Sequence, residues 1–182
     1  MPDRTFHNPE YVWYESLLRR LHELSFRGED QSEEADQIRE EMSFPFRRLT
    51  EQERVRLQEI SGDLFMLEGD LEGEEVYEPA PPEDRTPDGL GDALLQAWKA
   101  GEWETVLKLL RRGPEFLPLP LVAHMRDLAF HALGHLDIAR LFAIYVLERD
   151  SEIAALAPDG VTAWLEATIV GAPPLADRLP QR

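Results

Sequence analysis

Nineteen residues near the middle of the chain, from Gly69 to Pro87, constrain the fold more than any other stretch. They read GDLEGEEVYEPAPPEDRTP and contain seven acidic side chains, four prolines and two glycines. Proline and glycine interrupt helices and strands, and the like charges repel one another, so this stretch cannot build a core of its own. It is predicted to be an acidic linker, or a strap laid on a neighbouring surface, between residues 1–68 and residues 88–182.

The N-terminal part, residues 1–68, has apolar side chains at helical spacing. The pattern predicts three helices, at about residues 9–27, 32–43 and 51–68. Because each helix presents an apolar stripe that has to be buried, we expect a small three-helix bundle.

Capping residues support these boundaries. Asn8 and Ser32 are candidate N-caps, because their side chains can accept hydrogen bonds from the free N–H groups at the start of a helix. Thr50 and Glu53 have the spacing of a capping box. Pro45 is expected to end the second helix.

The C-terminal part, residues 88–182, repeats a pattern of helix, glycine and helix. Gly101 and Gly134 each follow one apolar helical stretch and precede another, and they are 33 residues apart. A period in this range is typical of arrays of helical hairpins. The pattern predicts an all-α fold with two stacked hairpins and a final helix, near residues 159–169, that caps them.

The stretch GHLDIARLFAIYVLERDSE, residues 134–152, resembles the second helix of a tetratricopeptide repeat. The match comprises a turn glycine, an acid three places on, small or apolar residues at the helix contact and a closing acid, namely Gly134, Asp137, Ala139, Ala143, Val146 and Asp150. A more degenerate copy includes Gly101, Trp103 and Glu104. The resemblance covers about residues 88–150. It implies hairpins whose first helices line a groove that binds a peptide or helix of a partner.

The N-terminal part is similar to a family of uncharacterised bacterial proteins, through LLRRLHELSFRGEDQSEEADQIREEM and RLTEQERVRLQEISGDLFML. This resemblance implies a bacterial origin and no particular chemistry. The sequence has no apolar run near the roughly 18 residues of a membrane span. Its first residues also lack the basic and then apolar pattern of a signal peptide. We therefore expect a cytoplasmic protein.

The charge of the chain limits its classes of partner. It has 36 acidic and 19 basic residues, a net charge of −17. Binding to nucleic acid or to anionic membranes relies on Lys and Arg, so we expect neither. The absence of cysteine excludes disulfides, thiolate metal ligands and cysteine nucleophiles.

Histidine side chains suggest a metal site, but their spacing is unfavourable. His124, Asp127 and His131 lie at i, i+3 and i+7 of one predicted helix. The two histidines are then about 10 Å apart along the axis, too far to share an ion without ligands from another element. His131 and His135 have the i, i+4 spacing of helical zinc sites, but Gly134 interrupts their helix. We expect no metal or other cofactor; the alternative is a metal-dependent helical enzyme that uses His124, Asp127 and His131.

No other catalytic pattern stands out, because the chain lacks a nucleophile elbow, a P-loop, a Glu-x-x-His pair and a calcium loop. The sequence therefore predicts a non-catalytic adaptor or assembly subunit that binds an apolar or amphipathic segment of another protein. The groove positions that the repeat resemblance implies are Leu95, Trp98, Lys99, His124, Leu128 and His131.

Three further possibilities stay open at this point. The groove residues could simply belong to the core of the hairpins. The chain could be a purely structural subunit of a homo-oligomer. The acidic strap could also occupy the chain's own groove, with Leu71, Val76 and Tyr77 as anchors.

Overall fold

The computed structural model describes residues 8–68, 89–113 and 116–169. Within these ranges the chain is all α, with helices and no strand, as the sequence predicts. Contacts divide the chain into two compact units, Met1–Val76 and Tyr77–Arg182. The predicted acidic linker, residues 69–87, lies outside the described residues.

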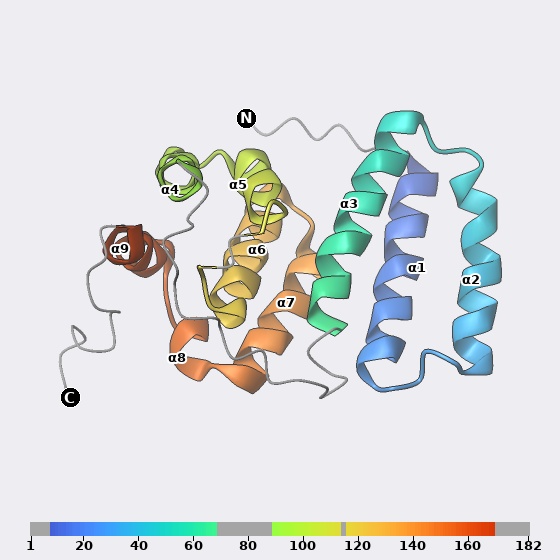
Figure 1. Ribbon diagram of the computed structural model, residues 1–182. Coiled ribbons are helices and arrows are strands. Elements are labelled where there is room, and N and C mark those ends of the chain that lie inside the picture. Colours follow the sequence, from blue (N-terminus) through green and yellow to red (C-terminus); the bar gives the residue numbers. More distant parts are fainter. Residues whose placement is uncertain (1–7, 69–88, 114–115, 170–182) are drawn as a thin grey trace. The chain divides into compact units, whose positions relative to one another are not determined.

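The described part of the N-terminal unit contains three helices, α1 (Pro9–Phe26), α2 (Glu33–Phe46) and α3 (Glu51–Glu68). Helix α1 lies between the other two and packs against both (Figure 1). On one flank of α1, Tyr11 shares a buried cluster with Leu49 and with Leu57 of α3. On the other flank, Trp13 Nε1 donates a hydrogen bond to Glu41 Oε1 of α2, at 3.2 Å. The central helix therefore contacts both neighbours, through apolar packing on one side and through a hydrogen bond on the other.

The helices of this unit begin with the predicted caps. The side-chain oxygens of Asn8 and Ser32 accept hydrogen bonds from backbone N–H groups in the first turns of α1 and α2. Thr50 and Glu53 form the capping box, in which Glu53 N–H donates to Thr50 Oγ1 and Thr50 N–H donates to Glu53 Oε2. The predicted boundaries of α1 and α3 are confirmed to within one residue.

The predicted end of α2 is wrong. Pro45 was expected to stop the helix near residue 43, but α2 continues through Phe46. Proline at this position removes an intrahelical hydrogen bond, because it has no backbone N–H to donate. Packing compensates for it, because Pro45 is buried and the ring of Phe46 lies 5.7 Å from that of Tyr14.

Glu53 links the starts of α1 and α3. Its Oε2 atom accepts hydrogen bonds from the N–H and the hydroxyl of Thr50, and from Nδ2 of Asn8 at 3.1 Å, in a side chain that is 6% exposed. Burial on its own raises the pKa of this carboxyl. The hydrogen bonds from Thr50 and Asn8 together outweigh burial, so the pKa of Glu53 lies below its ordinary value.

We expect Glu53→Gln to destabilise the N-terminal unit by about 1 kcal/mol at neutral pH, because it removes the charged acceptor. The pKa is lower in the folded state, so this stabilisation is complete above the unfolded pKa and disappears as pH falls through the folded pKa. Urea unfolding between about pH 3 and pH 7 should show a difference from the parent that shrinks toward acid. Glu51→Gln, an exposed acid in the same turn, is the matched control. A pH-independent difference would contradict this assignment.

The described part of the C-terminal unit contains two helical hairpins followed by two further helices. The hairpins are α4 (Leu90–Ala100) with α5 (Trp103–Leu110), and α6 (Leu119–Leu133) with α7 (Leu136–Arg149). Gly101 and Gly134 end α4 and α6 at φ of +67° and +89°, a region that favours glycine. The repeated glycine pattern therefore predicted both inter-helix turns correctly.

Helix α6 is central to this unit and packs against both α5 and α7 (Figure 1). Phe130 of α6 is stacked on Phe142 of α7, with ring centroids 5.6 Å apart, and both side chains are fully buried. The α6–α7 hairpin thus has an aromatic core of its own.

The chain leaves the second hairpin through the short α8 (Ser151–Ala154) and ends its described part with α9 (Pro158–Ile169). Asp150 starts α8, because its side chain accepts hydrogen bonds from two backbone N–H groups of that helix. Helix α9 packs against α4, the first helix of the unit, and buries Val161 and Leu165. The expected final helix is present, and its described packing partner is the first hairpin.

Candidate functional site

The six predicted groove residues lie on two helices of the C-terminal unit and differ in exposure. Helix α4 carries Leu95, Trp98 and Lys99, and α6 carries His124, Leu128 and His131. The two aromatic side chains at positions 98 and 124 are buried, the two leucines are half-buried, and the side chains at positions 99 and 131 are exposed. Only Lys99 and His131 therefore present largely exposed side chains.

Two of the α4 residues contact α9 of the same chain. Trp98 is 3% exposed, and its Nε1 donates a hydrogen bond to the carbonyl oxygen of Pro158 at 3.2 Å. Lys99 forms an ion pair with Glu166. While α9 is docked, Trp98 is not available to a partner.

His124 also contacts the segment that leads into α9. Its Nε2 lies 2.7 Å from the carbonyl oxygen of Leu156. A carbonyl oxygen only accepts hydrogen bonds, so we assign the proton to Nε2. The other ring nitrogen, Nδ1, lies 3.6 Å from Asp127 Oδ2. The imidazole therefore holds the turn before α9 in place.

These contacts disfavour the metal-dependent alternative. One ring nitrogen of His124 is already hydrogen-bonded to the carbonyl oxygen of Leu156. His131, on the same helix, is exposed. His135 follows Gly134 at the start of α7, so it does not continue the helix that carries His131, as the intervening glycine suggested. In residues 8–68, 89–113 and 116–169, no three His, Cys, Asp or Glu side chains come together as a metal-binding group.

An exposed apolar face on α7 was not predicted. Leu136, Ile144 and Leu147 are 58%, 41% and 63% exposed, although each is a large apolar side chain. The half-buried Ala143 and the exposed Arg140 lie between them at helical spacing. We call these five residues the α7 face.

Comparison with the first hairpin emphasises this exposure. The positions 33 residues before Arg140 and Ala143 are Leu107 and Leu110 of α5, and both are buried. In helical arrays, each repeat covers an apolar face of its neighbour. In the described part of the chain, the corresponding face of α7 is open to solvent.

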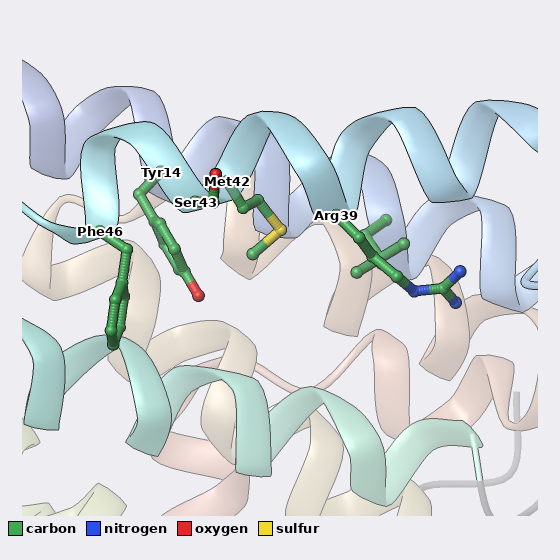
Figure 2. A pocket seen from close by; sticks show the side chains of 6 residues that line it. Tyr14, Arg39, Met42, Ser43 and Phe46 are labelled. Carbon is green, nitrogen blue, oxygen red and sulfur yellow. The ribbon is translucent and has the colours of Figure 1, made fainter.

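A second candidate surface lies in the N-terminal unit. A hollow of about 350 Å³, open to solvent, is lined by Tyr14, Leu21, Arg39, Met42, Ser43 and Phe46. Figure 2 shows the rings of Tyr14 and Phe46 side by side at one end and Arg39 at the other. The guanidinium of Arg54 lies over Phe46, 5.0 Å from the ring centroid.

The chemistry of this hollow does not suggest catalysis. None of its lining residues is His, Cys, Asp or Glu, so the lining offers no acid–base pair to Ser43. Burial raises the pKa of Tyr14 above its ordinary value, which keeps the phenol neutral. Arg39 is held by the Asp36 carboxylate and the Asp30 carbonyl, at 2.8 and 2.6 Å.

Sequence reasoning missed the α7 face for an identifiable reason. Apolar residues occur all around α7, and this pattern is typical of a fully buried helix. The one available signal was the position of α7 as the last long helix of the repeated pattern. The strap anchors Leu71, Val76 and Tyr77 lie outside the described residues.

Comparisons with known proteins add no assignment. A scan against protein-family models, a search of curated proteins and a search of solved structures each find no match. Among the helices that the structure describes, none is long and apolar enough to cross a membrane. The all-α fold is established, and the similarity to tetratricopeptide repeats stays a prediction.

Proposed function

We propose that this protein is a non-catalytic interaction protein whose C-terminal unit binds a segment of a partner protein through the α7 face. The observation that carries this proposal is the exposure of Leu136, Ile144 and Leu147 on one side of one helix. Single exposed apolar side chains are common on soluble proteins, whereas several on one face are typical of interaction sites. Burying this face supplies a driving force for association.

The predicted groove on α4 and α6 supports the same class of function. That surface holds a helix of its own chain through Trp98 and Lys99, so its chemistry suits a helical ligand. A partner at this groove would have to displace α9. The α7 face needs no such displacement, and we therefore place the partner there.

Site-specific crosslinking tests this proposal. A photoreactive phenylalanine analogue replaces Leu147 in the full chain, which is produced in its native host and irradiated. We expect a discrete adduct heavier than the chain by the mass of another protein, and we expect Leu136→Gln to reduce it. The matched control carries the analogue at Val12, which is also 58% exposed but lies in the N-terminal unit.

Three results would contradict the proposal. Equal adducts from positions 147 and 12 would mean that the α7 face has no selectivity. An adduct of twice the chain mass would instead favour a structural homo-oligomer. Stoichiometric zinc, iron or manganese in the purified protein would favour the metal-dependent alternative.

A further inference from the structure

We propose that the partner segment bound by the α7 face is a positively charged amphipathic helix. This inference rests on the proposed function and adds the chemical class of the ligand. It follows from the spacing, the size and the charge of the exposed side chains on α7.

The spacing of the face matches a helix. Leu136, Arg140, Ala143 and Leu147 follow one another at intervals of four, three and four residues. This is the seam spacing with which one helix packs along another, and peptide helices bind through anchors at the same intervals. The small side chain of Ala143, in the middle of the seam, lets the backbone of a second helix approach closely.

The size of the face suits a short segment. Helix α7 has 14 residues, which corresponds to a length of about 21 Å. A strip of this length and about 10 Å wide, the width of one helix with its side chains, covers far less than the roughly 800 Å² per partner that a stable protein–protein interface buries. The face alone is therefore too small for a constitutive dimer and fits a reversible helical ligand.

Two acidic side chains beside the α7 face favour a cationic ligand. Asp137 and Glu148 lie seven residues before and four residues after Ile144, so both acids lie alongside the edge of the α7 face that Ile144 forms. Both acids are exposed; Glu148 also lies 3.7 Å from Arg149. Arg140 is the single cation among the exposed side chains of the face, and the whole chain has a net charge of −17. Lys or Arg along one edge of the ligand would pair with the two acids.

Two labelled peptides of about 18 residues, long enough to span α7, serve as probes. One has Leu on its apolar face and Lys elsewhere, and the other has the same Leu positions with Glu. Fluorescence anisotropy with the full chain should show binding of the Lys peptide and at least about tenfold weaker binding of the Glu peptide. Binding of the Lys peptide should weaken as salt rises.

Variants of the full chain locate the binding site. Leu147→Gln removes a 63% exposed apolar side chain without adding charge. It should lower the affinity for the Lys peptide at least about tenfold. Phe44→Gln, at a 62% exposed position of the N-terminal unit, is the matched control and should leave its affinity unchanged. The double variant Asp137→Lys with Glu148→Lys should lower the affinity for the Lys peptide and raise the affinity for the Glu peptide.

The outcomes separate this inference from the proposed function. Equal affinity for both peptides, with loss in Leu147→Gln, would overturn the charge preference. If Leu147→Gln leaves the affinity for the Lys peptide unchanged, the peptide is attracted non-specifically to an acidic protein. That result would contradict the α7 face as the binding site. If neither peptide binds but the crosslinker at position 147 captures another protein, this inference fails and the proposed function stands.

Discussion

Replacing Trp98 by alanine is expected to destabilise the C-terminal unit by about 3–5 kcal/mol. The side chain is 3% exposed and its ring lies 5.2 Å from that of Trp103, in an edge-on arrangement. Its removal leaves a cavity next to α4 and deletes the hydrogen bond to the Pro158 carbonyl. Urea unfolding followed by far-UV circular dichroism measures the loss.

A conservative variant separates packing from hydrogen bonding at this position. Trp98→Phe keeps most of the ring but has no N–H donor, and we expect it to cost about 1–3 kcal/mol. The Pro158 carbonyl retains the hydroxyl of Thr162 at 2.9 Å, which limits this cost. A loss below about 1 kcal/mol for Trp98→Ala would mean that α9 contributes little to the packing around this ring.

The unfolding free energy of Trp98→Ala also tests whether Trp98 belongs to the predicted groove or to the core. Truncating an exposed side chain that contacts only a partner changes the stability of the free protein little. A large cost would therefore identify Trp98 as part of the folded core, one of the possibilities that the sequence left open. A small loss of stability would keep Trp98 as a candidate binding residue.

Local chemistry explains which elements could be predicted from the sequence. The starts of α1, α2 and α3 depend on side chains within a few residues of each helix end, such as Asn8, Ser32 and the Thr50–Glu53 pair. The turns at Gly101 and Gly134 depend on backbone conformations that glycine favours. The missed end of α2 had a tertiary cause, since Pro45 and Phe46 are retained by packing.

The candidate site could not be predicted to the same degree, because its contacts join residues far apart in the sequence. Trp98 meets Pro158 across 60 residues, and His124 meets Leu156 across 32. Helical spacing identifies an apolar side chain without saying whether it meets a partner, the chain's own helix or solvent. The same ambiguity concealed Leu136 and Leu147, whose pattern resembles that of the buried core.

The hollow in the N-terminal unit illustrates the same limit at shorter range. Tyr14 and Leu21 belong to the apolar stripe that predicted α1, but Phe46 lies beyond the predicted end of α2. The hollow exists because α2 continues far enough for Phe46 to reach Tyr14. An error of three residues at one helix end therefore hid a surface feature that involves two helices.

Phe130→Ala is expected to cost about 3–5 kcal/mol in the free energy of unfolding of the C-terminal unit. Phe130 is fully buried, stacked on Phe142 and edge-on to His135 at 6.0 Å, so alanine removes contacts on both helices of the second hairpin. Phe130→Leu preserves most of the buried volume and should cost less than half as much. Phe44→Ala, an exposed phenylalanine in the N-terminal unit, should change stability little.

Hydrogen exchange read by mass spectrometry locates the effect of Phe130→Ala. Peptides from α6 and α7 should lose protection, because exchange from a buried hairpin requires opening of the unit that contains it. Peptides from α1, α2 and α3 should keep theirs, since that unit has a core of its own around Tyr11 and Leu57. Equal loss of protection in both sets would mean that the chain unfolds as one cooperative body, and the division into two units would then have no energetic meaning.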